Sequence, residues 1–155
     1  MPEAANIEEL RERLYGECGR SIACRNAADY YIALVKNPCY PPADGATYKM
    51  RHYYMEFVRK YGPPPRCDVK ALVEERLRGT ALEKYAREAG EFAELLKREL
   101  NITSRVAAAV ATIVVAERSG AGAARYAVAA RFGASVAAVN AWLRHALKLY
   151  ATWRA

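Results

Sequence analysis

Apolar side chains recur at intervals of three and four residues along most of the chain, and no stretch alternates strictly between apolar and polar residues. The three-to-four spacing places apolar side chains on one face of an α-helix, whereas strict alternation would indicate a β-strand. Helices are therefore predicted over the segments 6–15, 25–36, 48–61, 68–78, 80–100, 105–118, 123–132 and 135–153. We expect an all-α fold.

Polar and conformationally special residues mark the ends of these segments. Side chains that can cap a helix stand at the start of several of them: Asn6, Asp68, Thr80 and Ser135. Gly16 and Gly19 are expected to end the first helix, and Asn37-Pro38 the second, because glycine and proline are poor helix formers. The loop 39–45 follows, and its two prolines predict a rigid connection.

The run Gly62-Pro-Pro-Pro65 is the clearest boundary in the chain. Three consecutive prolines cannot continue a helix and favour extended backbone. The sequence therefore predicts a helical N-terminal arm over 1–62 and a helical bundle body over 63–155. The second part is rich in alanine, and small side chains allow helix axes to approach closely.

The predicted helix 48–61 is both aromatic and basic. Residues at helical spacing form one apolar face that we expect to be core: Met50, Tyr54, Phe57 and Tyr61. The opposite face is polar and comprises Lys49, His52, Glu56, Arg59 and Lys60, while Tyr53 lies between the two faces. About half of the aromatic side chains in this helix are thus explained as hydrophobic anchors.

The formal net charge of +7 is unevenly distributed. Residues 20–60 contain seven basic and three acidic side chains, and residues 101–155 contain seven basic side chains and Glu117 alone. Residues 1–19 are acidic, and residues 61–100 are balanced. Two basic blocks favour a polyanionic partner, of which nucleic acid is the most common, although a surface excess of Lys and Arg is also typical of thermophile proteins.

The segment 30–61 also holds seven of the eleven tyrosines. Lysine and arginine supply phosphate contacts that do not depend on base sequence, and tyrosine can donate to phosphate or lie against sugar. Tyrosine can stack on bases only where the strand is unpaired. The residues predicted to bind nucleic acid are Arg20, Arg25, Lys36, Lys49, Arg51, Arg59, Lys60, Tyr48 and Tyr53.

Catalytic, metal and membrane signatures do not stand out. The cysteines at 18, 24, 39 and 67 form no C-x-x-C pair, and His52 and His145 are predicted on helix surfaces, so we expect no metal, no cofactor and no enzyme. The cysteines serve either as packing residues or as disulfides such as Cys39 with Cys67, and intracellular disulfides are mainly found in hyperthermophiles. No apolar run reaches a membrane span, and no signal peptide is expected.

Ala129, Gly133 and Val139 have the spacing of a helix-turn-helix motif, although an ordinary antiparallel helix hairpin requires similar residues. Base reading needs long polar side chains near the start of the second helix. That helix offers Ser135, Ala137, Ala138 and Asn140 before Arg144, and is therefore expected to read sequence poorly. The segment 103–147 resembles the second cyclin-like repeat of archaeal transcription factor B, which implies a DNA-binding regulator.

A second resemblance covers most of the chain. Tyr61-Gly62-Pro63, the turn 120–123, and Tyr126 followed by 131–134 are similar to features of the major capsid proteins of filamentous archaeal viruses, the rudivirus, lipothrixvirus and tristromavirus group. In that family an N-terminal helical arm wraps the genome and a helical bundle forms the outer body. The resemblance implies a virion protein, assembled in the host cytoplasm, that packages double-stranded DNA.

It further implies that two copies, or this chain and a paralogue, clasp A-form DNA within a helical polymer, with neighbouring subunits covering the apolar face of the arm. Three hypotheses follow from the sequence: a DNA-packaging coat protein, a helix-turn-helix regulator, which would be cytoplasmic, and a sequence-independent single-strand binder. Packaging predicts regular polymers, a regulator predicts a preferred site, and a single-strand binder predicts loss of binding on Tyr→Ala changes.

Overall fold

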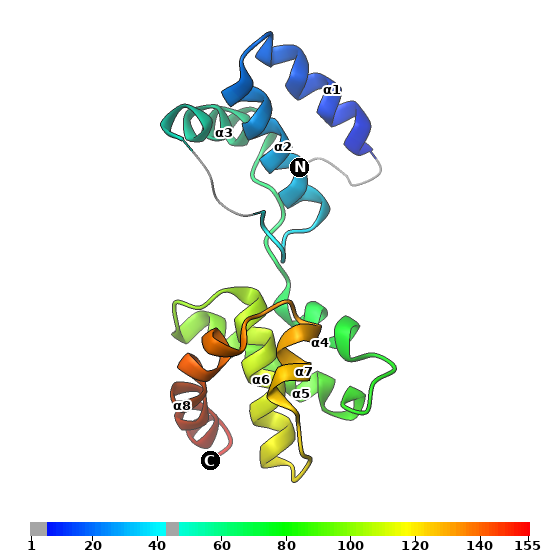
Figure 1. Cartoon of the computed structure of the whole chain (residues 1–155), viewed down its shortest axis with the longest axis vertical. Helices are drawn as coiled ribbons and strands as arrows, with labels where there is room; N and C mark the ends of the chain where they lie inside the picture. Colours follow the sequence, from blue (N-terminus) through cyan, green and yellow to red (C-terminus); the bar gives the residue numbers. More distant parts are fainter. Residues whose placement is uncertain (1–5, 43–46) are drawn as a thin grey trace. The chain divides into compact units, whose positions relative to one another are not determined.

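The computed structural model describes residues 6–42 and 47–155. Within these ranges it contains the helices α1 to α8, a short 3-10 helix and no β-strand, which confirms the all-α fold. The chain divides into two compact units, Met1–Cys67 and Asp68–Ala155 (Figure 1). The first unit ends at Cys67 rather than at Gly62, because the Tyr31 hydroxyl donates to the carbonyl of Gly62 at 2.6 Å and Cys67 is bonded to Cys39.

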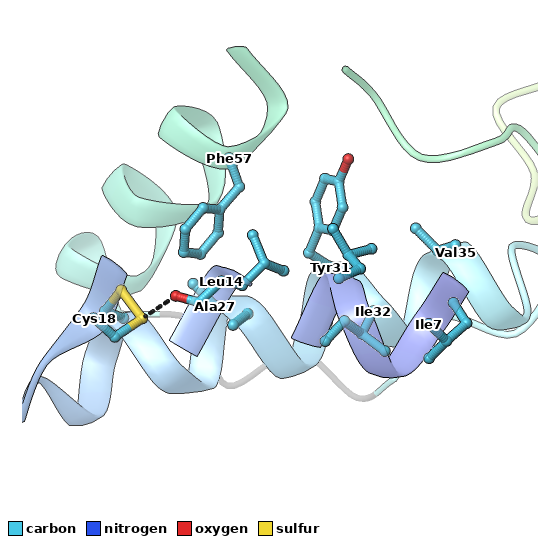
Figure 2. Close-up of a cluster of buried hydrophobic side chains, with 11 residues drawn as sticks. Ile7, Leu14, Cys18, Ala27, Tyr31, Ile32, Val35 and Phe57 are labelled. Carbon is cyan, nitrogen blue, oxygen red and sulfur yellow. Dashed lines mark hydrogen bonds between the residues drawn. A yellow bond between two sulfur atoms is a disulfide. The ribbon is translucent and has the colours of Figure 1, made fainter. Parts of the chain in front are cut away.

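Three helices form the N-terminal unit: α1 (Ile7–Cys18), α2 (Ile22–Lys36) and α3 (Tyr48–Tyr61). The middle helix α2 packs against both others. Figure 2 shows the core between them, to which α1 contributes Leu14 and α2 contributes Tyr31, both fully buried.

The remaining helix covers this core with its apolar face, where Phe57 is buried and Met50, Tyr54 and Tyr61 are half-buried. This face was predicted to be core, and α1 and α2 of the same chain pack against it. The segment 1–62, which was predicted as a helical arm, belongs to a three-helix unit with its own core.

Several helix ends differ from the predictions. Gly16 lies inside α1, which continues to Cys18 because Leu14 and Cys18 both face the core, and the helix stops at Gly19 with φ of 56°. Asn6 occupies the position before α1, but its side chain makes no capping hydrogen bond. The second helix begins earlier than predicted, because the Ser21 side chain accepts a hydrogen bond from the Cys24 backbone.

All four cysteines form disulfides. The Cys39–Cys67 bond closes a loop between residues that are 28 apart in sequence, and it confirms the pairing considered from the sequence. Cys18 and Cys24, for which packing was the simpler interpretation, form a second bond that joins the end of α1 to the start of α2. The predicted loop 39–45 is described only as far as Pro42.

The C-terminal unit is built around one buried helix. Its elements are α4 (Val69–Leu77), a 3-10 helix (Glu83–Tyr85), α5 (Ala86–Glu99), α6 (Ser104–Arg118), α7 (Arg125–Arg131) and α8 (Val136–Trp153). The helix α6 contacts α4, α5, α7 and α8 (Figure 1). Every residue from Ala107 to Ala116 is buried, so α6 is apolar on all sides, as expected of a central core helix.

Local signals set most boundaries in this unit. The side chains of Asp68 and Ser135 cap α4 and α8 as predicted. Thr80, in contrast, does not begin a long helix: its hydroxyl donates to the Leu77 carbonyl and accepts from the Leu82 backbone, which closes a turn, and α5 starts only at Ala86. No helix in the described part of the chain is long and apolar enough to cross a membrane.

Candidate nucleic-acid interface

All of the predicted nucleic-acid-binding residues belong to the N-terminal unit, and all except Tyr53 are exposed. The structure places them at several different locations. The turn before α2 holds Arg20, the helix α2 holds Arg25 and Lys36, and α3 holds Tyr48, Lys49, Arg51, Tyr53, Arg59 and Lys60. Arg25 and Lys36 lie near opposite ends of α2, roughly 16 Å apart along the helix axis. These residues are therefore carried by three different segments of the unit.

The basic residues at the end of α3 are engaged within the unit. Arg59 pairs with Glu56, and Lys60 pairs with Glu17 of α1. The Tyr61 hydroxyl also donates to Glu17, at 2.6 Å. Because these carboxylates partly neutralise the two cations, the end of α3 is a weaker phosphate site than its sequence indicates.

The ionisation of this cluster reflects the same contacts. Burial raises the pKa of Glu17, but the hydrogen bonds from Lys60 and Tyr61 and the charge of Lys60 outweigh it, so the pKa is lowered overall. Burial, the hydrogen bond to Glu17 and the negative charge of Glu17 raise the pKa of Tyr61 to about 12. The cluster is therefore most stable with Glu17 charged and Tyr61 neutral.

Arg25 is also committed to contacts within the unit. Its guanidinium donates to the carbonyl of Gly19 at 2.9 Å and lies 5.7 Å from the centre of the Tyr15 ring. The Tyr15 hydroxyl donates to Asp29, and this hydrogen bond, followed by burial and the charge of Asp29, raises the pKa of Tyr15. Arg25 thus helps to fasten the α1–α2 turn.

At the beginning of α3, exposed basic residues lie at or near a pocket. A shallow pocket of about 370 Å³ is lined by Ser21, Tyr48, Lys49, His52 and Tyr53. Lys49 and Arg51 are exposed, and no carboxylate of the described residues forms an ion pair with either of them. Of the predicted residues, the pocket brings together Tyr48, Lys49 and Tyr53.

The C-terminal unit contains a second candidate interface, formed by α7, the following turn and α8. Ala129 is 1% exposed and Val139 is fully buried, so both positions of the predicted motif face the core. Gly133 adopts φ of 67°, a conformation that favours glycine, and the Ala134 backbone donates to the Ala129 carbonyl at 2.9 Å. The spacing therefore corresponds to a tight turn between two packed helices.

This pair of helices presents basic side chains that the sequence analysis did not include among the site residues: Arg125, Arg131, Arg144 and Lys148, all exposed. Their signal in the sequence is the basic block 101–155, in which Glu117 is the only acidic residue. Arg131 donates to the Arg76 carbonyl at 2.9 Å and so ties α7 to α4.

Along α8 the exposed positions Ala137, Ala141, Arg144 and Lys148 recur at helical spacing and form one stripe. The first half of the stripe has small side chains and the second half is cationic. Exposed Asn140 lies beside it, and its amide oxygen is 3.4 Å from the Arg125 guanidinium. The stripe is therefore suited to close approach and charge attraction rather than to hydrogen bonding with bases.

Among the described residues, no group of three or more His, Cys, Asp or Glu side chains is placed to hold a metal ion. No family model, curated protein or solved structure matches the chain.

Proposed function

We propose that the protein binds double-stranded DNA through the surface of α7 and α8, by phosphate contacts that do not depend on base sequence. The observation that carries the proposal is the turn at Gly133 between two packed helices, with Arg144 and Lys148 exposed on the second. An α-helix fits the major groove, and the two cations lie one helical turn apart on the same face of α8.

Lack of base reading is supported by the side chains at the start of α8. Direct readout relies on Arg, Lys, Asn, Gln, Asp or Glu placed against base edges. Ala137 and Ala141 carry only methyl groups, which can contact thymine but cannot discriminate by hydrogen bonding. Asn140 is the exception, and its carbonyl oxygen is already oriented by Arg125.

A packaging role is the form of this activity that indifference to sequence favours. The likeness to filamentous virus coat proteins implies the same role but assigns the DNA contacts to the N-terminal arm, whereas we propose α7 and α8. In that role many copies, of this chain alone or with a paralogue, would coat DNA as a polymer without catalysis. A regulator related to transcription factor B is the second candidate, and the packed turn between α7 and α8 is the observation that favours it.

The proposal is tested by fluorescence anisotropy with random-sequence duplex DNA. The double variant Arg144→Ala/Lys148→Ala should bind at least tenfold more weakly at low salt, and its log–log salt slope should fall by about 1.8, for two lost phosphate contacts. Arg11→Ala/Arg13→Ala is the matched control, because it removes the same charge from α1, where both arginines pair with glutamates. Equal losses in both variants would contradict a role for α8.

Electron microscopy of the same mixtures separates the two candidate roles. Filaments of uniform diameter whose length follows that of the DNA support packaging. Discrete particles, together with a preferred site found by selection from random duplexes, support a regulator instead. Bare DNA at low salt would contradict duplex binding altogether.

A further inference from the structure

The pocket at the beginning of α3 is separate from the proposed duplex-binding surface, since it is formed only by the N-terminal unit. Its lining combines a cation, an imidazole and two phenol rings, and the described lining residues include no carboxylate. The pocket volume of about 370 Å³ lies in the lower part of the range for small-ligand sites, which begins at roughly 300 Å³. The chemistry of the lining indicates an anionic ligand with an aromatic part.

Tyr48 is the most unusual member of this lining, because it is 88% exposed while the other described tyrosines of the N-terminal unit are packed against the core or half-buried. An exposed phenol ring offers a flat face for stacking. Tyr53 provides a second ring, which His52 contacts edge-on at a centroid distance of 5.8 Å. Bases stack on exposed aromatic rings of this kind in proteins that bind single strands.

Lys49 provides the positive charge next to these rings. Lys49 is exposed and has no ion pair among the described residues, in contrast to Lys60 at the other end of the same helix, which pairs with Glu17. The Ser21 hydroxyl accepts a hydrogen bond from the Cys24 backbone, and a hydroxyl that accepts can also donate to a phosphate oxygen. Phosphate and ring contacts therefore lie within one pocket.

We infer that this pocket binds an unpaired nucleotide, with its phosphate at Lys49 and Ser21 and its base stacked on Tyr48 or Tyr53. The faces of paired bases are covered by their neighbours in a duplex, so tyrosine can stack only on an unpaired base. The nucleotide comes either from a single strand or from solution as a mononucleotide. The inference does not depend on the proposed duplex binding, because the two surfaces share no residue.

The test uses the full chain and a fluorescent oligothymidylate of about eight nucleotides, a length within the site size of single-strand binding domains. Tyr48→Ala should weaken binding roughly tenfold, and Tyr48→Phe should retain it because the ring is kept. Lys49→Ala should lower the log–log salt slope by about 0.7, the value for one phosphate of a single strand. Lys84→Ala is the charge-matched control, exposed in the 3-10 helix of the C-terminal unit, and should bind normally.

Two further arms complete the design. The same substitutions are repeated in the Arg144→Ala/Lys148→Ala background, where any strand binding by α8 is removed, so that failure of one proposal is distinguished from failure of the other. Thymidine monophosphate is added as a competitor: competition at millimolar concentration assigns the pocket to free nucleotides, and competition by oligonucleotides alone assigns it to strands. Unchanged oligothymidylate binding by Tyr48→Ala and Lys49→Ala would overturn the inference.

Discussion

The two units of this chain achieve a stable core in different ways. The N-terminal unit builds its core from a few large side chains, among them Tyr31 and Phe57, and adds two disulfides. The C-terminal unit buries every residue from Ala107 to Ala116 of the alanine-rich helix α6 and contains none of the four cysteines. Small domains bury a smaller fraction of their surface, so covalent links matter most where the core is smallest.

The comparison extends to surface charge. In the N-terminal unit, Arg59 pairs with Glu56 of the same helix, and Lys60 pairs with Glu17, which connects α3 to α1. In the C-terminal unit, Arg144 and Lys148 are exposed, and no ion pair joins either of them to a described carboxylate. The two cations at the end of α3 are therefore used for the structure of the N-terminal unit, whereas the two on α8 are exposed.

Removal of the disulfides should have the largest effect on stability, and it tests whether they stabilise the core of the N-terminal unit. Loss of Cys39–Cys67, through Cys39→Ser/Cys67→Ser, should destabilise the N-terminal unit by about 3.5 kcal/mol, since its loop is long. Loss of the shorter Cys18–Cys24 loop should cost about 2 kcal/mol. Hydrogen exchange resolved by peptide should show faster exchange in α1 to α3 and unchanged exchange in α6.

Both tryptophans, Trp142 and Trp153, belong to the C-terminal unit, so their fluorescence provides the internal control for the same samples. The urea midpoint measured by tryptophan emission should not move on reduction. A matching loss in both units would contradict the view that the covalent links serve the N-terminal core alone.

Overpacking of α6 should have the next largest effect, and in the opposite unit. Ala109 is fully buried in the central helix, so Ala109→Leu has no space for its added carbons and should destabilise the C-terminal unit by roughly 1–3 kcal/mol. Ala151→Leu on the exposed surface of α8 is the control and should change stability by less than about 0.5 kcal/mol. Urea unfolding followed by tryptophan fluorescence measures both, and equal effects would mean that α6 is not tightly enclosed.

Acid titration should have the smallest effect on stability, and it tests whether the ion pair of Glu17 stabilises the N-terminal unit. The pKa of Glu17 is lowered in the folded state, so its contribution is present above the ordinary value of 4.5 and is lost as pH falls through the lowered value. A partly exposed pair of this kind contributes at most about 1 kcal/mol. Glu17→Gln should remove this acid dependence in hydrogen exchange of α1 and α3, whereas Glu9→Gln, at an exposed pair with Arg13, should leave it intact.

The hydrogen bond between Tyr61 and Glu17 also makes the stability of the N-terminal unit depend on pH in the alkaline range. The pKa of Tyr61 is raised to about 12, so its contribution is complete below the ordinary value of 10.0 and is lost as pH rises from there to about 12. Tyr61→Phe should reduce the loss of stability of the N-terminal unit between pH 10.0 and about 12. If Tyr61→Phe leaves the dependence of stability on alkaline pH unchanged, Tyr61 is not hydrogen-bonded to Glu17 in solution.

Much of the fold could be predicted because its signals are local. Helical periodicity identified the helices, and the caps at Asp68 and Ser135 act within three residues of their own positions. The turn at Gly133 requires a conformation that glycine adopts readily. Each of these features depends on residues within about one helical turn and can therefore be predicted from the sequence.

Contacts between distant residues were decided only by the tertiary structure. Gly16 was predicted to end a helix, yet burial of Leu14 and Cys18 against α2 carries α1 through it. Lys49 and Lys60 look alike in sequence, but packing of α1 beside the end of α3 places Glu17 against Lys60 alone. The sequence by itself determined which segments are helical and where charge accumulates, whereas the packing of those helices decided which charges are paired, because ion pairing depends on distance in space.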